Sequence, residues 1–172
     1  MIQASTIKGH GLALDFEGNL KNGIREIGVV YFLNFKIIDT RELVVNKSID
    51  LIGILEDISK YQFIISHNVM IEKNLITNLF PYPKCHTNTL KQWGPWLDTV
   101  KIYQKLYPNL STYDLKFLVA QFLDKNVIDI LSSNYCKEDK RKYHNALFDA
   151  LCSFMLVKRL CDLIDLQNFL QN

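Results

Sequence analysis

The sequence predicts an α/β fold in which helices flank a mixed sheet, made of an antiparallel three-strand meander plus parallel strands. Three consecutive segments between residues 11 and 45 are expected to be strands, and the second and third of them are rich in β-branched and aromatic residues. Beyond them, segments with helical spacing alternate with one short apolar run, residues 63–65, which suits a parallel strand covered on both faces. The chain has 172 residues and no internal repeat or linker, so we expect one domain over residues 1–172.

The first strand, residues 11–17, ends in two acidic residues. Side chains alternate between the faces of a strand, so Leu14 and Phe16 point to one face. Asp15 and Glu17 then share the other face. Two carboxylates this close are costly unless a cation lies between them or one of them stays protonated. The pair therefore suggests a divalent metal site, although the pair by itself favours an exposed strand end with two solvated acids.

The next segments complete the meander. Asn22-Gly23, within a turn over residues 18–23, is typical of a type I′ hairpin. Strands are expected over residues 24–33 and 35–45, followed by a helix over residues 49–61.

His67 and Asn68 end the fourth strand, which should lie parallel to the first strand. In such sheets, functional sites form at the carboxyl ends of the central strands. We therefore expect His67 and Asn68 to lie near Asp15 and Glu17.

The rest of the chain is expected to be mainly helical. The expected order is a helix over residues 69–80, a loop over 81–95, ordered structure over 97–106, a helix from the capping-box-like residues 111–114 to 123, a charged and mobile segment over 137–142, and a helix from about 145 to 163.

The last helix carries one carboxylate, Asp149, among apolar residues. Its neighbours three and four positions away on the same face, Asn145, Ala146, Cys152 and Ser153, are all small. A face of small residues lets a helix approach a sheet closely, which would bring Asp149 against the end of the first strand. A capping or solvated aspartate is the alternative.

His144 comes just before this helix. An imidazole there can be exposed to solvent and can accept a proton from water near neutral pH. Four basic residues precede it, namely Lys137, Lys140, Arg141 and Lys142. They either contact phosphates or belong to a solvated loop.

Three motifs resemble, in this order, those of the DnaQ-like (DEDDh) 3′→5′ exonucleases, a family that includes the proofreading epsilon subunit of bacterial replicative polymerase. The first motif, Asp-x-Glu on the first strand, is met by residues 15–17, and the second, His-Asn followed by an acid, is approached by residues 67–72. The third and most specific motif, a histidine and then an aspartate before an alanine, is matched by residues 144–150. The resemblance spans residues 11–160 and includes a connecting segment over residues 97–118.

Two departures from the family pattern affect the site. Glu72 stands where the family usually has aspartate, which bears on activity. Gly18-Asn19 replaces the small residue and threonine that commonly touch the terminal nucleotide, which bears on substrate preference.

The resemblance implies an RNase H-like fold and two divalent cations, Mg²⁺ or Mn²⁺, which prefer carboxylate and water oxygens. The implied metal ligands are Asp15, Glu17, Glu72 and Asp149. His144 would be the general base. The implied substrate contacts are Gly18, Asn19, His67, Asn68, Lys140, Arg141 and Lys142. The substrate would be the 3′ end of DNA or RNA, and a DNA polymerase is a further partner that the resemblance suggests. The alternative is an inactive exonuclease-like module that binds nucleic acid or a polymerase without cutting.

The composition is that of an ordinary globular protein, with 48% hydrophobic and 22% charged residues. A net charge of +2 argues neither for nor against nucleic acid. The cysteines, which have no Cys-x-x-Cys spacing, favour buried thiols over disulfides or zinc ligands. With no hydrophobic signal region and no run of 18 apolar residues, we expect a cytoplasmic protein without a membrane span.

Overall fold

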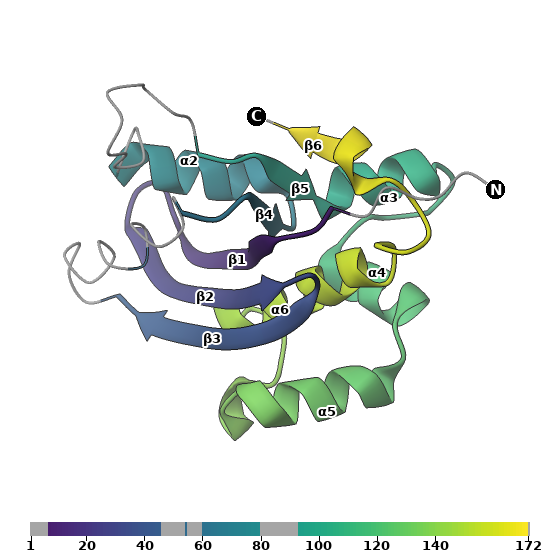
Figure 1. The fold of residues 1–172 in the computed structure, drawn as a ribbon. Helices are drawn as coiled ribbons and strands as arrows, with labels where there is room; N and C mark the ends of the chain where they lie inside the picture. Colours follow the sequence, from purple (N-terminus) through teal and green to yellow (C-terminus); the bar gives the residue numbers. More distant parts are fainter. Residues whose placement is uncertain (1–6, 46–53, 55–59, 80–92, 172) are drawn as a thin grey trace.

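The computed structural model describes residues 7–45, 54, 60–79 and 93–171, which form a mixed sheet with helices on both faces (Figure 1). The strands are β1 (His10–Asn19), β2 (Gly23–Leu33), β3 (Lys36–Val44), β4 (Phe63–Ser66), β5 (Trp96–Asp98) and β6 (Leu170–Gln171). The helices are α2 (Val69–Leu79), α3 (Thr99–Leu106), α4 (Leu115–Phe122), α5 (Lys125–Tyr135) and α6 (Ala146–Lys158), with 3₁₀ helices η2 (Glu138–Lys140) and η3 (Leu166–Phe169). The sheet has six strands in the order β3-β2-β1-β4-β5-β6.

The strand directions confirm the predicted mixed sheet. β1, β2 and β3 form an antiparallel meander, while β4 runs parallel to β1 and β5 parallel to β4. Ala13 of β1 lies beside Ile65 of β4, so the carboxyl ends of these two strands meet at one edge, as predicted. β6 adds an antiparallel edge strand to β5, which the sequence pattern did not predict.

The type I′ turn predicted between β1 and β2 is found instead between β2 and β3. Between β1 and β2 the connection has three residues, and Gly23 has a positive φ of 76° while Asn22 does not. The Asn19 side chain organises this turn by accepting hydrogen bonds from two backbone N–H groups. Between β2 and β3, by contrast, two residues suffice, and Asn34 and Phe35 have the paired positive φ values, 49° and 57°, of a type I′ turn. The buried Phe35 side chain offsets the cost of a positive φ at an aromatic residue.

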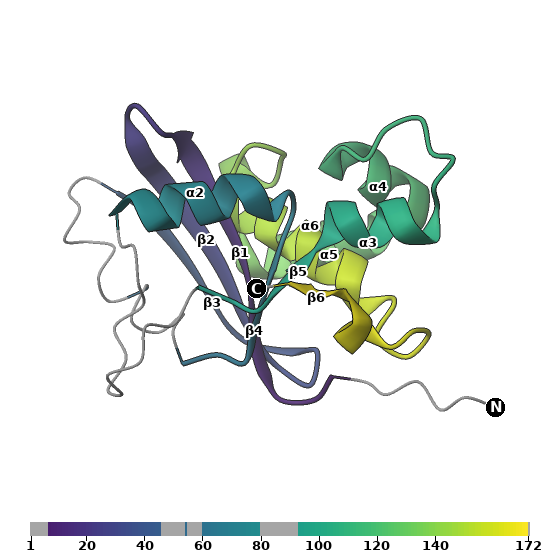
Figure 2. The ribbon, with the colours of Figure 1, turned by 90° about the horizontal axis from the view of Figure 1, so that it is seen from above.

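Each face of the sheet has its own core (Figure 2). α2 covers one face, where Leu12, Leu14 and Phe16 of β1 are buried. α6 packs on the other face, where Ala13 of β1 is buried, and α3, α4 and α5 pack against α6 on that side. The alternation of side chains along β1 is therefore as predicted, and Asp15 and Glu17 lie on the α6 side.

Several helix boundaries differ from the predictions. α4 begins at Leu115, one residue after the predicted capping box, and its N-cap Asp114 makes no side-chain capping hydrogen bond. α6 ends at Lys158 rather than near residue 163, because the N–H groups of Leu160 and Cys161 bond three residues back and tighten the chain. The predicted helix over 49–61 and the loop over 81–95 fall mostly outside the described residues.

The predicted buried thiols are found at Cys136, Cys152 and Cys161, all of which are free and buried. Cys85 lies outside the described residues. In the described ranges, every helix is too short or too polar to span a membrane.

α6 approaches β2 closely at its first turn. A Cβ atom added to Gly28 would overlap the backbone of Ala146 and Leu147, so only glycine allows this spacing. Ala146 itself has no exposed surface. The small face of the helix thus packs on the sheet, as the sequence predicted.

Replacing Ala146 with leucine should therefore destabilise the protein by about 1–3 kcal/mol, because the added atoms overpack this contact. Chemical denaturation measures the free energy of unfolding. Ala120→Leu is the matched control, because Ala120 is exposed on α4 and its replacement should be nearly neutral. Equal stabilities for the two variants would show that the face of α6 at Ala146 does not pack tightly on the sheet.

Candidate metal and catalytic site

The acidic residues of β1 lie where its regular pairing with β2 ends. A β-bulge follows Glu17, which is paired with Glu26 across the two strands. Asp15 is partly buried, and the Glu17 side chain is 19% exposed, 3.6 Å from the exposed guanidinium of Arg25. Both acids are therefore only partly accessible to solvent.

Glu72 reaches the same edge from the opposite face of the sheet. It lies in the first turn of α2, is only 3% exposed, and accepts a hydrogen bond from the backbone N–H of Phe16 at 3.0 Å. The pairing between β1 and β4 has ended before Phe16, so this N–H needs an acceptor outside the ladder. The hydrogen bond fixes the Glu72 carboxylate directly beside Asp15.

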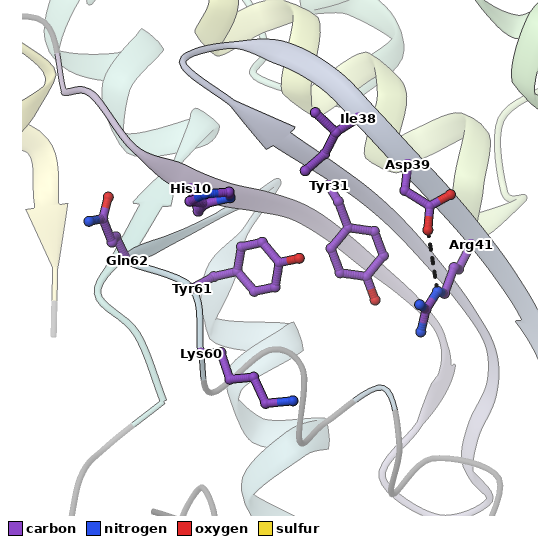
Figure 3. Close-up of a pocket in the computed structure, with 8 residues that line it drawn as sticks. All are labelled: His10, Tyr31, Ile38, Asp39, Arg41, Lys60, Tyr61 and Gln62. Atoms are coloured by element: carbon purple, nitrogen blue, oxygen red, sulfur yellow. Dashed lines mark ion pairs between the residues drawn. The ribbon is translucent and has the colours of Figure 1, made fainter.

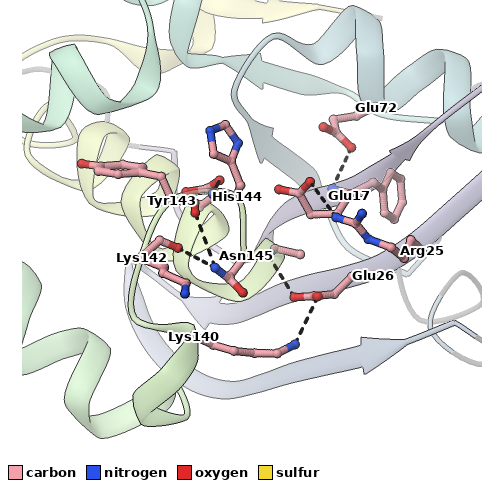
Figure 4. A network of polar contacts seen from close by, with 12 residues as sticks. Glu17, Arg25, Glu26, Glu72, Lys140, Lys142, Tyr143, His144 and Asn145 are labelled. Atoms are coloured by element: carbon pink, nitrogen blue, oxygen red, sulfur yellow. Dashed lines mark hydrogen bonds and ion pairs between the residues drawn. The ribbon is translucent and has the colours of Figure 1, made fainter.

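Asp149 completes the set from α6. It is 7% exposed, and its Oδ2 accepts a hydrogen bond of 2.9 Å from the backbone N–H of His144. His144 is exposed and has a positive φ of 65°, a conformation that this hydrogen bond stabilises. The site therefore combines four acids from β1, α2 and α6 with one accessible imidazole. Figure 4 shows Glu17, Glu72 and His144 of this set.

Burial, and after it the proximity of the other acids, raises the pKa values of Asp15, Glu72 and Asp149. Burial raises the pKa of Asp15 well above its usual value, and the charges of Asp149 and Glu17 raise it further. Burial also raises the pKa of Glu72, and the charge of Asp15 raises it further. The hydrogen bond from the Phe16 N–H lowers this pKa in part. The pKa of Asp149 rises to about 7, chiefly through burial. Such a cluster holds protons in the absence of a cation.

The donor set fits divalent cations. Ligand atoms of Glu17, His144 and Asp149 all lie within 4.8 Å of one another. Asp149 Oδ1 is buried, and within the described ranges no donor is placed to hydrogen-bond it. A buried carboxylate oxygen without a partner is costly unless a cation takes it as a ligand. Carboxylates are the ligands that Mg²⁺ and Mn²⁺ prefer.

The raised pKa values predict an unusual pH dependence of stability. The folded protein holds its carboxyl protons more tightly than the unfolded chain does, so the free energy of unfolding should fall as pH rises from about 4, the usual carboxyl value, toward the pKa of about 7 at Asp149. One such carboxyl contributes up to about 1.4 kcal/mol per pH unit within this window. Added Mn²⁺ should reverse the trend, because cations bind the deprotonated carboxylates.

Thermal midpoints from pH 5 to pH 8, measured with EDTA or with Mn²⁺, test this expectation. The gap between the two conditions should widen as pH rises. Asp149→Asn is the control variant, in which the metal-free slope should be shallower. A metal-free midpoint that rises across this range would contradict the proton-holding cluster.

His67 and Asn68 lie at the same edge but take part in the framework. His67 Nδ1 lies 2.7 Å from Thr99 Oγ1, and burial lowers the pKa of His67 to about 4, so the ring is neutral. Asn68 is exposed with a positive φ of 61°. Its backbone N–H and that of Val69 donate to the Asp98 carboxylate at 3.1 and 3.2 Å.

Asp98 is a residue whose role the sequence prediction missed. Besides the start of α2, it caps α3 by accepting from the N–H of Val100 at 2.9 Å. One carboxylate thus holds the beginnings of two helices, one of which carries Glu72. Its position at the end of a buried apolar strand was the available signal.

Gly18 and Asn19 both serve the β1–β2 hairpin. A Cβ atom at Gly18 would overlap the carbonyl oxygen of Gly23. Asn19 Oδ1 accepts from the N–H groups of Lys21 and Asn22 at 3.0 and 2.8 Å. Both residues are exposed near Glu17, so the backbone there is accessible while the Asn19 oxygen is already engaged.

The basic residues before His144 differ from one another, and the segment expected to be mobile contains the 3₁₀ helix η2. Contrary to the expectation of a free phosphate-binding cation, Lys140 is only 18% exposed and forms ion pairs with Glu26 and Glu42 at 3.1 and 3.3 Å. Arg141 donates to the backbone carbonyls of Cys136 and Ser133. Lys137 and Lys142 are exposed.

A separate cavity of about 470 Å³ lies at the other end of the sheet, near the start of β1 (Figure 3). Tyr31 and Tyr61 line it with their ring centroids 5.3 Å apart, and the Arg41 guanidinium lies over the Tyr31 ring. None of the predicted site residues lines this cavity.

Comparisons with known proteins show the fold. No protein-family model and no curated protein matches the sequence. A solved structure described as "Exonuclease X in complex with 5′ overhanging duplex DNA" is similar, with a TM-score of 0.51 and 20% identity over 92% of this chain and 91% of that chain. The mixed sheet and its flanking helices are those of an RNase H-like fold, as the sequence predicted.

Proposed function

We propose that this protein is a metal-dependent 3′→5′ exonuclease that releases nucleoside monophosphates from single-stranded or frayed 3′ ends of DNA or RNA. The observation that carries the proposal is the convergence of four carboxylates from three elements, with one exposed histidine, at a single edge of the sheet. The similar structure is an exonuclease bound to DNA, which supports a nuclease. The polarity of cleavage and the DEDDh assignment rest on the resemblance of the three sequence motifs.

Asp15, Glu17, Glu72 and Asp149 would hold two divalent cations, Mg²⁺ or Mn²⁺. Bound there, such ions supply an activated water and stabilise negative charge on the leaving 3′ oxygen. His144, exposed and hydrogen-bonded through its backbone to Asp149, accepts the proton of the attacking water. Lys142 and the backbone at Gly18, both exposed, would contact the phosphates and the terminal nucleotide.

The test uses 5′-labelled single-stranded DNA and RNA, incubated with the protein in Mn²⁺ or in EDTA. A ladder that shortens from the 3′ end, only in Mn²⁺, is the expected result. Asp15→Asn, purified in the same way, controls for a contaminating nuclease. An oligonucleotide that is retarded on a native gel but remains intact would instead support a binding module. The glutamate at position 72, where the DnaQ-like motif usually has aspartate, is compatible with that alternative.

A further inference from the structure

We propose that Glu26 is a positioning residue that holds both ends of the segment carrying His144, an inference that deepens and rests on the proposed function. One oxygen of its carboxylate, Oε2, pairs with Lys140 Nζ at 3.1 Å. The other, Oε1, accepts the backbone N–H of Ala146 at 3.1 Å. Residues 141–145, which include His144, are the loop between these two contacts (Figure 4).

Glu26 is a rigid anchor. It lies within β2, directly opposite Glu17, and its side chain is 11% exposed. Gly28, two residues on and therefore on the same face, lets the start of α6 approach the sheet. The Glu26 carboxylate can thus reach the first N–H of α6 while the backbone of Glu26 keeps its place in β2.

The start of α6 needs this outside acceptor. The first N–H groups of a helix have no partner within it, and a side chain at the N-cap position usually supplies one. Asn145 occupies that position but makes no capping hydrogen bond, and its amide nitrogen donates to the carbonyl oxygen of Lys142 at 3.0 Å. Glu26 instead accepts the first of these N–H groups, that of Ala146, and its negative charge is favoured at the positive end of the helix.

Lys140 secures the other end of the loop. Its ammonium lies between Glu26 on β2 and Glu42 on β3, and all three side chains are less than a fifth exposed. A lysine held by two carboxylates is a poor ligand for phosphate, so its role here is structural. Together, the two ends of the loop confine His144 in its positive-φ conformation beside Asp149.

Glu26→Ala should therefore lower kcat by about 10–100-fold while leaving KM unchanged, because it displaces His144 without removing a substrate contact. The same variant should speed hydrogen exchange of the Ala146 amide by about tenfold. Glu26→Gln keeps an acceptor for Ala146 but loses the charge that pairs with Lys140. It should protect the Ala146 amide as wild type does, and should recover most of kcat.

Asp39→Asn is the matched control. It also removes an acid from a neighbouring strand, but Asp39 is exposed and forms its ion pair with the exposed Arg41. Wild-type exchange at Ala146 and wild-type kcat in Glu26→Ala would overturn the inference. A wild-type protein that cleaves no oligonucleotide would refute the proposed function alone, since the exchange comparison still decides the role of Glu26. If Glu26→Ala does not fold, exchange in Glu26→Gln decides, and loss of Ala146 protection there would count against the inference.

Discussion

Replacing His144 with alanine is expected to slow oligonucleotide cleavage by about 10²–10⁴-fold, because the attacking water loses the base that accepts its proton. The fold should survive, since the hydrogen bond to Asp149 comes from the backbone N–H of residue 144 and not from the ring. Stabilisation by Mn²⁺ should also survive if the imidazole is not a metal ligand. Single-turnover cleavage and the Mn²⁺-dependent shift in thermal midpoint measure the two effects separately.

His10→Ala is the control for this substitution. His10 is exposed at the opposite end of β1, and its loss should leave both measurements unchanged. The distance of the His144 ring from the acids makes the second measurement informative, because the ring lies within 4.8 Å of ligand atoms of Glu17 and Asp149. If the Mn²⁺ shift disappears in His144→Ala, then His144 is a metal ligand and the base must be sought elsewhere.

Replacing Glu72 with glutamine is expected to abolish metal-dependent cleavage. A glutamine amide oxygen can still accept the N–H of Phe16, so the local structure should persist while one ligand charge is lost. The thermal midpoint without metal should be unchanged or raised, because the substitution removes the cost of burying the Glu72 charge and its repulsion with Asp15. Cleavage of labelled single strands and thermal melts in EDTA provide the measurements.

Two variants frame this result. Glu72→Asp restores the charge with a shorter side chain and should keep some activity. Glu138→Gln removes an exposed carboxylate in η2 and should change neither quantity. If Glu72→Gln cleaves at the wild-type rate, the site does not use four acids, and a one-metal mechanism or a binding module becomes the better account.

The glutamate at position 72 fits its surroundings. It starts from α2, on the face of the sheet opposite α6, and crosses the end of the shorter strand β4 to reach the backbone of β1. The extra methylene of glutamate lengthens this reach relative to aspartate. Its burial and its hydrogen bond to Phe16 place the carboxylate beside Asp15 rather than in solvent.

Local pattern predicted the elements better than it predicted their ends. Side-chain alternation along residues 11–17 was sufficient to assign faces, because a strand repeats every two residues. The turns were less predictable. Asn22-Gly23 has the residues of a type I′ turn, yet that geometry occurs at Asn34 and Phe35, where burial of the Phe35 ring compensates the backbone.

The sequence by itself determined which residues are candidates for the site and at which edge of the sheet they lie. Asp15, Glu17, Glu72 and Asp149 were identified from spacing and motif, and the parallel strands β1 and β4 bring the first three to one edge. Only the tertiary structure decided how the fourth acid and His144 are held. The hydrogen bond between Ala146 and Glu26 joins residues that are 120 positions apart in the chain. Helical and strand periodicities report on neighbours within a few residues, so they carry no information about such a pairing. The buried charge of Glu26 within an apolar strand was its one local sign, and the partner it needed could be identified only after the chain had folded.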